Sequence, residues 1–518
     1  MVRNGPLVFH PFLFAIAPVI SLFSHNVEIL LMNELYIPMV LVLVFTVALL
    51  FLLGLAIRDI ERAGVIVSGF LILFFSFGHI VHATRHWRIG TFIAGEHIYV
   101  QVILWTGIFF LYAYLFARGS KPLKVATYIL NIASIALIAI PLVKTGDFKL
   151  RAAIASYDLK NAKNAEIVST PLQRTDSLPD IYFIILDRYA DARTLKETYE
   201  FDNKEFISYL SGKGFYVAGE SKSNYLKTAH SVASSLNLEY INHLAEGLGE
   251  DFADWSPLYE MLQDYKVWRF LKSKGYRFIH FGSWWGPTRS NRNADINVDS
   301  DPLPQLLYVL YRNTILYPLG SPFGILDFRL ANWKRVHSQF TKLEEIPNIK
   351  EPTFVFAHFL ITHEPYAFNR DGQFLTIEQY AKRSRRENYV EQVIFANTMI
   401  RALVDKLLSN SQKLPIIIIQ SDEGPLPERF ESDEFGFNWN QATIQELREK
   451  MGILNAYYLP NAREKVLYES ITPVNSFRLV FNLYFNTNLE LLPDRNYAFM
   501  DQRHPYKFFD VTNVVKDR

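Results

Sequence analysis

Long apolar runs fill the first 145 residues, and the rest of the chain alternates apolar with charged segments. The runs lie near residues 11–23, 35–57, 64–83, 98–117 and 125–143. A helix needs about 20 apolar residues to cross a bilayer, so this part predicts about five membrane spans, the first of them short and containing a proline. Several runs follow one another, so we expect a retained anchor rather than a cleaved signal peptide.

The basic residues in the short loops between these runs predict the orientation. One set of loops carries Arg3, Arg58, Arg62, Arg118, Lys121 and Lys124, and the opposite set carries Arg85 and Arg88. Basic loops stay in the cytoplasm. With an odd number of spans, the chain after Lys144 is therefore expected outside the cytoplasm. The chain is therefore predicted to be a multi-pass protein of the cell membrane.

The remainder divides into a polar juxtamembrane linker at 146–178 and a domain at 179–518. In that domain, apolar strand-like runs alternate with amphipathic helical stretches. The predicted strands are 181–186, 276–281, 353–360, 415–420 and 453–459, and the predicted helices are 194–213, 229–244, 256–273, 378–410 and 473–485. This alternation is typical of an α/β fold with a mostly parallel sheet flanked by helices.

Composition excludes several classes of function. The 53 basic and 52 acidic residues give a net charge of +1, which provides no electrostatic basis for binding nucleic acid. The sequence contains no cysteine. Disulfides, thiolate metal sites and a cysteine nucleophile are therefore absent.

Two predicted strands end on acidic residues. Four consecutive isoleucines at 416–419 lead into Asp422-Glu423-Gly424, and the strand at 181–186 leads directly into Asp187. Open α/β sheets bind their ligands beyond the carboxyl ends of the strands. The pattern indicates a metal or phosphate centre, while solvated acids at strand ends remain the alternative.

Five motifs in order resemble the alkaline phosphatase/sulfatase superfamily. They are a strand ending in Asp187, SNYLKTAHSVAS at 223–234, GYRFIHFGSWWG at 275–286, FAHFLITHEPY at 356–366 and IIIIQSDEGP at 416–425. The order and the five N-terminal spans resemble most the membrane-anchored branch that includes lipoteichoic acid synthase and related phosphoglycerol transferases. The resemblance covers about residues 179–485 and implies a sulfatase-like, extracytoplasmic catalytic domain.

The resemblance implies particular site residues. Asp187 and Asp422 correspond to metal ligands, and Thr228, in a T-x-x-S-x-x-S pattern, corresponds to the nucleophile. A helix N-terminus offers N–H groups to a tetrahedral anion, and a bound metal lowers the pKa of a hydroxyl. The alternatives are that Thr228 is an ordinary helix cap and that Ser231 is the nucleophile.

Glu423 stands where the phosphatases and transferases of this group usually have histidine. Glutamate can ligate a hard cation, so one divalent ion held by Asp187, Thr228, Asp422 and Glu423 is expected. Ligation through oxygen alone favours manganese, magnesium or calcium. The sulfatase signature is absent, because Val232 stands in place of its arginine. Ser283 and Trp285 likewise replace a lysine and a histidine.

Histidine and aromatic positions complete the set of candidates. His363 corresponds to the histidine that contacts the transferred group or the leaving oxygen. Trp285 and Arg289 resemble residues that hold a glycerophosphate, and His280 is a further substrate-binding candidate. His358, inside a strand, is interpreted as a core residue.

The function predicted is a metal-dependent phosphotransferase or hydrolase that acts on phosphate esters through a threonine nucleophile. Its expected partner is a membrane lipid or a lipid-linked glycopolymer of the envelope. Two alternatives stay open: a sulfatase-like hydrolase of sulfate esters, and a non-catalytic binding domain on a degenerate sulfatase fold, which the substitution at Glu423 suggests.

Overall fold

The computed structural model describes residues 6–28, 30–89, 92–119, 122–160, 178–298, 303–430, 436–461 and 466–516. The chain forms two compact units. The first comprises Met1–Arg151 with Leu303–Phe328, and the second comprises Ala152–Pro302 with Arg329–Arg518. Arg3, Lys121 and most of the predicted linker lie outside the described residues. The sequence did not predict that residues 303–328 join the first unit.

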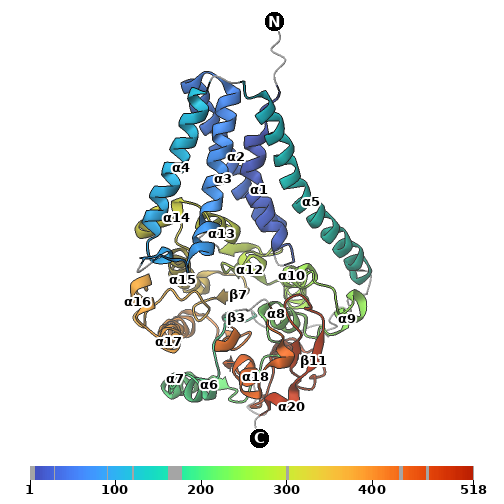
Figure 1. Ribbon diagram of the computed structural model, residues 1–518. Helices are drawn as coiled ribbons and strands as arrows, with labels where there is room; N and C mark the ends of the chain where they lie inside the picture. The colour runs from blue at the N-terminus through green and yellow to red at the C-terminus, as the bar shows by residue number, and fades with distance from the viewer. Residues whose placement is uncertain are drawn as a thin grey trace. The chain divides into compact units, whose positions relative to one another are not determined.

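Five helices in chain order make up most of the first unit (Figure 1). They are α1 (His10–His25), α2 (Tyr36–Ile57), α3 (Ile60–Thr84), α4 (Ile98–Arg118) and α5 (Lys124–Lys160). Four are long and apolar enough to cross a membrane, while α1 has only 16 residues. At 1.5 Å per residue α1 extends roughly 24 Å, which is shorter than a bilayer core of about 30 Å.

Short elements connect these helices. They are η1 (Met32–Leu35), the hairpin of β1 (Arg88–Ile89) and β2 (Phe92–Ile93), and η2 (Ala94–Glu96). The α2–α3 and α4–α5 turns lie at one end of the bundle, where Arg62 on α3 donates to the carbonyl of Phe116 on α4 at 2.8 Å. Both turns therefore belong to the same side, as their shared basic character predicts.

Residues 303–328 pack at the other end of the bundle. They form α13 (Gln305–Arg312), α14 (Leu316–Gly320) and η3 (Ser321–Phe323). Leu306 and Leu310 are buried in the core of the first unit. Gly78 donates its N–H to the carbonyl of Asn313 at 3.0 Å. A Cβ on Gly78 would stand 2.6 Å from the Asn313 Cα, so glycine permits this approach.

A seven-stranded mixed sheet organises the second unit, in the order β4-β9-β8-β3-β7-β5-β6. Strands β8, β3, β7, β5 and β6 run parallel, and β9 is antiparallel to both β8 and β4. The bounds are β3 Ile181–Leu186, β4 Tyr216–Val217, β5 Arg277–Phe281, β6 Ile296–Val298, β7 Thr353–Phe359, β8 Ile416–Gln420 and β9 Asn455–Tyr458. This confirms the predicted fold class.

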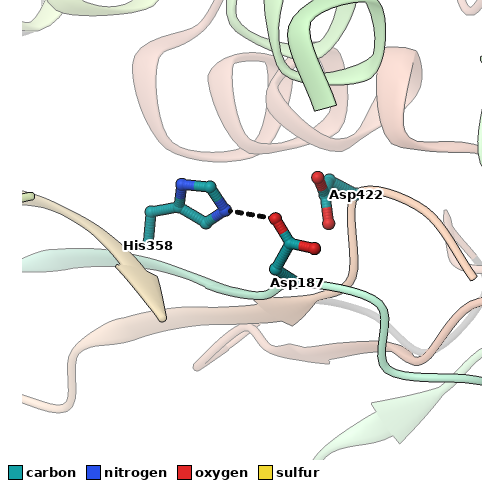
Figure 2. A group of neighbouring side chains, drawn as sticks. All are labelled: Asp187, His358 and Asp422. Atoms are coloured by element: carbon teal, nitrogen blue, oxygen red, sulfur yellow. Dashed lines mark hydrogen bonds and ion pairs between the residues drawn. The ribbon is translucent and has the colours of Figure 1, made fainter. Parts of the chain in front are cut away.

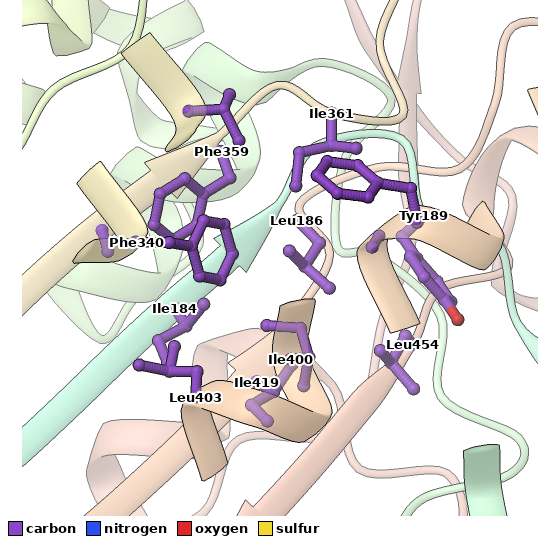
Figure 3. Packing of buried hydrophobic residues seen from close by; sticks show 14 of the residues in the cluster. Ile184, Leu186, Tyr189, Phe340, Phe359, Ile361, Ile400, Leu403, Ile419 and Leu454 are labelled. Atoms are coloured by element: carbon purple, nitrogen blue, oxygen red, sulfur yellow. The ribbon is translucent and has the colours of Figure 1, made fainter. Parts of the chain in front are cut away.

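Helices cover both faces of this sheet. Alternate side chains of β3 join opposite cores: Ile184 and Leu186 pack with Ile400 and Leu403 of α17 on one face (Figure 3), and Phe183 packs on the other. Strands buried on two faces need apolar residues at every position, which explains the unbroken apolar runs in the sequence.

The remaining helices of the second unit are mostly short. They are α6 (Ala192–Glu197), α7 (Lys204–Gly212), α8 (Thr228–Asn237), α9 (His243–Leu248), α10 (Ser256–Gln263), α11 (Lys266–Ser273), α12 (Gly286–Arg289), α15 (Phe328–Leu343), α16 (Ile377–Ala381), α17 (Arg385–Asn410), α18 (Ile444–Met451), α19 (Ser476–Phe485) and α20 (Thr512–Val515). The 3₁₀ turns are η4 (Ile346–Asn348), η5 (Glu428–Phe430), η6 (Trp439–Gln441) and η8 (Pro473–Asn475), and β10 (Tyr497–Phe499) pairs with β11 (Phe508–Asp510).

Four predicted helices are each divided into two, and one of them, 229–244, comprises α8 and the first residues of α9. The stretch 194–213 is split between α6 and α7, 256–273 between α10 and α11, and 378–410 between α16 and α17. Thr376 and Ser384 each form a capping box at the start of α16 and α17. The second cap begins a new helix inside an apolar pattern that reads as continuous.

Candidate metal centre

Three adjacent parallel strands bring Asp187, His358 and Asp422 together. Asp187 directly follows β3, Asp422 follows β8, and His358 is the sixth residue of β7. One ligand atom from each lies within 4.8 Å of the other two. Figure 2 shows the His358 ring and the two carboxylates facing one another at this edge of the sheet. Asp187 and Asp422 are therefore brought together as the sequence predicts, with His358 as a third member.

The strand register produces this meeting. His358 pairs with Ile185 of β3, and Ile185 also pairs with Gln420 of β8. The Asp187 N–H continues the ladder by donating to the Phe359 carbonyl at 3.0 Å. Because the carboxyl ends of parallel strands share one edge of the sheet, residues distant in sequence converge there.

Several oxygens of these carboxylates are buried without a hydrogen bond. Among the described residues, Asp187 Oδ1 and both carboxylate oxygens of Asp422 have no hydrogen-bond partner. Burial, together with the neighbouring carboxylates of Asp187 and Glu423, raises the pKa of Asp422 well above its usual range. The Thr228 hydroxyl and Lys450 act in the opposite direction and lower it. Burying such groups without partners is costly. Two carboxylates with free acceptor oxygens, beside an imidazole, fit a divalent cation.

The electrostatics of Asp187 differ from those of Asp422. Burial acts to raise the pKa of Asp187, but His363, His358 and Arg188 outweigh it and hold that pKa well below its usual range. Asp187 is therefore the carboxylate that stays ionised, beside a neighbour whose ionisation is disfavoured.

His358 is oriented by a polar chain beneath it. Its Nε2 lies 3.1 Å from Asp187 Oδ2, and its Nδ1 lies 2.9 Å from Thr288 Oγ1. Thr288 Oγ1 in turn lies 2.8 Å from Ser283 Oγ. A hydrogen bond on one ring nitrogen leaves the other to bind a metal, as in many metal sites. The interpretation of His358 as a core residue missed this, although a histidine inside an otherwise apolar strand was a signal.

Thr228 occupies the first position of α8, and Lys227 is its N-cap residue. The Thr228 hydroxyl lies 3.4 Å from Asp187 Oδ2. Ser231, one turn later, is buried and donates its hydroxyl to the carbonyl of Tyr225 at 2.9 Å. Thr228 thus faces the carboxylates at a helix N-terminus, while the Ser231 hydroxyl is engaged by the backbone.

Glu423 lies beside this group but is held by cations. Its Oε1 accepts from Arg188 Nε at 3.1 Å and lies 2.8 Å from Lys450 Nζ. The next residue, Gly424, permits the backbone at Glu449 to approach closely, because a Cβ at this position would stand 2.2 Å from the Glu449 carbonyl oxygen. Burial lowers the pKa of Lys450 to about 8, although Glu423 acts in the opposite direction. The structure therefore places Glu423 in an ion-paired cluster next to the Asp187–His358–Asp422 group.

His363 lies in the loop after β7. Its Nδ1 is hydrogen-bonded to the carbonyl of Glu364, and its ring meets Trp284 edge-on with centroids 5.3 Å apart. A carbonyl only accepts, so Nδ1 carries the proton and Nε2 is left with a lone pair in the neutral ring. Burial and Arg188 lower the pKa of His363. The neutral ring, with a lone pair on Nε2, is therefore favoured, although Asp187 and Glu364 act in the opposite direction.

The other substrate-binding candidates lie in the segment after β5. His280 is buried against Phe356 and its Nε2 lies 2.9 Å from the Thr288 carbonyl, and burial lowers its pKa to about 4. Trp285 is half-buried, edge-on to Tyr259. Arg289 donates to the carbonyl of Trp284 at 3.2 Å. Within the described residues, His280 supports the Thr288 loop, and no contact joins Trp285 or Arg289 to the metal group.

The basic residues near the start of α17 are ion-paired. Lys382 binds Glu378, Arg383 and Arg370 share Glu391, and Arg386 binds Glu200. Arg385 binds Glu364, which also accepts from Arg188 at 2.8 Å. These ion pairs give the basic residues near the start of α17 a structural role.

Comparisons with known proteins find likeness at the level of structure alone. No family model and no curated protein matches the sequence. The lipooligosaccharide phosphoethanolamine transferase A (EptA) of Neisseria meningitidis matches 92% of this chain and 95% of its own, with 13% identity and a TM-score of 0.41. The C-terminal periplasmic domain of EptC from Escherichia coli matches 67% of this chain and 96% of its own, with 10% identity and a TM-score of 0.43.

A third match is a protein of the alkaline phosphatase superfamily from Vibrio parahaemolyticus. It covers 67% of this chain and 81% of its own, with 11% identity and a TM-score of 0.39.

Proposed function

We propose that this chain is a membrane-anchored, metal-dependent phosphotransferase of the alkaline phosphatase superfamily, acting on phosphate esters of envelope lipids. The observation that carries the proposal is the meeting of Thr228, at the start of α8, with the buried Asp187–His358–Asp422 group. A hydroxyl at a helix N-terminus beside a metal site has what nucleophilic phosphoryl transfer needs.

The proposed ligands are Asp187, His358 and Asp422, with the Thr228 oxygen as a fourth donor. A bound cation would lower the pKa of that hydroxyl and stabilise negative charge on the phosphoryl oxygens. Because an imidazole belongs to the set, the expected metal changes from the oxygen-preferring ions of the sequence prediction to zinc or manganese. Glu423 stays outside the proposed ligand set because its charge is balanced by Arg188 and Lys450.

The proposed reaction has two displacements at phosphorus. In the first, Thr228 Oγ bonds to phosphorus as the bond to the donor's alcohol oxygen breaks. In the second, an acceptor hydroxyl oxygen bonds to phosphorus as the bond to Thr228 breaks. His363 Nε2, which has a lone pair in the neutral ring, takes the proton from the attacking hydroxyl and returns it to the leaving oxygen.

The N-terminal unit supports the proposed membrane location and orientation of the enzyme. Four helices are long and apolar enough to cross a membrane, and basic residues gather in the α2–α3 and α4–α5 turns. By the positive-inside rule these turns face the cytoplasm and the catalytic unit faces outside. A phosphate ester in the outer leaflet then lies on the same side of the membrane as the catalytic unit.

The test compares Thr228→Ala with Ser231→Ala in the full-length protein. Thr228→Ala is expected to abolish turnover of a phosphodiester lipid and the covalent adduct seen by intact-protein mass spectrometry, with metal content largely kept. Ser231→Ala is expected to keep both, at a modest cost in thermal stability from one lost hydrogen bond. An adduct on Ser231 would contradict the assignment of the nucleophile. A folded, metal-loaded wild type without any adduct or turnover would favour a non-catalytic domain.

A further inference from the structure

A cavity of about 450 Å³ lies within the first unit, between the end of α3, the start of α4 and the segment 303–328. Residues of α3 between Phe77 and His82, with Arg85 just after the helix, form one wall, Ile98 of α4 contributes at the side, and Val309, Arg312 and Tyr317 form the opposite wall. This cavity is separate from the metal group, because all of its lining residues belong to the first unit.

The lining of this cavity is cationic. His79 and His82 come from α3, Arg85 directly follows that helix, and Arg312 comes from α13. No lining residue that the structure describes is an aspartate or glutamate. Arg312 lies over the ring of Tyr317, with Cζ 5.9 Å from the ring centroid. Two arginines and two histidines around one cavity match a phosphate, which arginine binds through paired N–H groups.

The position of the cavity is that of a membrane–water interface. The last turns of α3 lead into the β1–β2 hairpin, and the hydrocarbon region tolerates no lipid-exposed hairpin of this kind. Trp87 and Tyr99, both largely exposed, flank the same end of the helices, as aromatic residues do at headgroup level. A ligand in this cavity would therefore lie where lipid phosphates lie.

A second, apolar cavity lies one helical turn earlier along α3. It has a volume of about 180 Å³ and is lined by Phe74 and Phe75 of α3, Phe45 of α2 and Leu307 and Leu310 of α13. It lies next to the cationic cavity, on the side that is farther from the β1–β2 hairpin and closer to the middle of α3. A cationic cavity beside an apolar one, both walled by α3 and α13, fits an amphipathic ligand better than a free anion.

We propose that the cationic cavity binds the phosphate group of a membrane glycerophospholipid, with the acyl chains along the apolar surface of the bundle. Such a lipid would bridge α3 and α13, which already meet at the Gly78–Asn313 hydrogen bond. The lipid would thereby hold the segment 303–328, which interrupts the second unit in sequence, against the membrane helices. The proposal concerns binding only and does not depend on the reaction proposed above.

The test titrates the full-length protein in detergent with phosphatidylglycerol and counts bound lipid by native mass spectrometry. The double variant Arg85→Gln/Arg312→Gln is expected to bind the tightest lipid at least about tenfold more weakly than the wild type. The matched control Arg88→Gln/Arg118→Gln loses the same charge at positions that do not line the cavity, and is expected to bind as the wild type does. Equal weakening in both doubles would show a non-specific charge effect and overturn the proposal.

A second measurement uses the wild type alone, so it stands even if the cavity variant folds poorly. A phosphatidylglycerol carrying a photoreactive group near the phosphate is expected to label peptides from residues 77–85 or 305–318. Labelling confined to other helices would overturn the proposal. So would full displacement of the lipid by inorganic phosphate at equal concentration, because the site would then be one for a free anion.

Discussion

Asp422 and Glu423 are neighbours at the end of the same strand, yet they lie in opposite environments. Both are almost fully buried. Both oxygens of Asp422 lack a hydrogen-bond partner among the described residues, whereas Glu423 has one such oxygen, Oε2, and its Oε1 is bound by Arg188 and Lys450. Asp422 thus belongs to a group that is incomplete without a cation, while most of the charge of Glu423 is already balanced by the protein.

The comparison shows that residue type and position in a motif do not decide which carboxylate binds metal. The two side chains differ in what the opposite elements present to them. Asp422 meets another carboxylate and an imidazole, whereas Glu423 meets an arginine and a lysine. A carboxylate facing another carboxylate needs an external positive charge, and one facing two cations does not.

The strongest test of this difference is metal content. Asp422→Asn in the full-length protein is expected to lose the bound metal and to lower turnover by at least about a thousandfold, some 4 kcal/mol of transition-state stabilisation. The same change is expected to leave the metal-free protein no less stable, because it removes an ionisable group whose pKa burial has raised. Elemental analysis, turnover and thermal unfolding with and without chelator measure these effects. Full metal content in Asp422→Asn would place the site elsewhere.

Glu423→Gln is expected to show the opposite pattern. The metal is expected to remain, while stability falls by about 3–5 kcal/mol because Lys450 is left buried beside a neutral group, although Arg188 keeps its ion pair with Glu364. The double variant Glu423→Gln/Lys450→Met removes one of those charges and is expected to recover part of the loss, which thermal unfolding of the two variants and wild type would reveal. If Glu423→Gln lost the metal as Asp422→Asn does, the contrast between the two residues would be wrong.

A substitution at Thr288 tests whether the residue that orients His358 affects metal binding. Thr288→Val keeps the size of the side chain but removes the hydroxyl that faces His358 Nδ1. Metal affinity is expected to fall about 10–100-fold, as when the outer partner of a ligating histidine is lost. Thr362→Val, which removes a hydroxyl bonded to the Asp187 backbone carbonyl, is a control near the same site. An unchanged affinity in Thr288→Val would exclude this role.

The last test concerns the pH dependence of stability. The folded protein holds the pKa of His280 at about 4 through burial, whereas an unfolded histidine has a pKa near 6.5. Between these values the unfolded chain binds more protons, so stability falls as pH decreases from about 6.5 to 4. His280→Gln is expected to flatten this part of the profile of the metal-free protein by up to about 1.4 kcal/mol per pH unit. An identical slope in the variant would contradict the buried, neutral state of His280.

Much of the architecture could be predicted from the sequence. Unbroken apolar runs such as residues 416–419 predicted strands buried on both faces, and the first 145 residues predicted a helical membrane unit. Helix boundaries were less predictable, because the caps at Thr376 and Ser384 depend on local hydrogen bonds that an apolar pattern does not record. The sequence could not predict that residues 303–328 join the first unit, because this depends on a contact between Gly78 and Asn313, which lie far apart in the chain.

By itself, the sequence determined that Asp187 and Asp422 end strands of one parallel sheet and that Thr228 begins a helix, because these are consequences of local apolar patterns. Only the tertiary structure decided that His358 joins the two aspartates, that Ser231 is engaged by the backbone and that Glu423 is balanced by Arg188 and Lys450. The physical reason is that the role of a buried polar group depends on the charges and hydrogen-bonding atoms opposite it, and these come from distant parts of the chain.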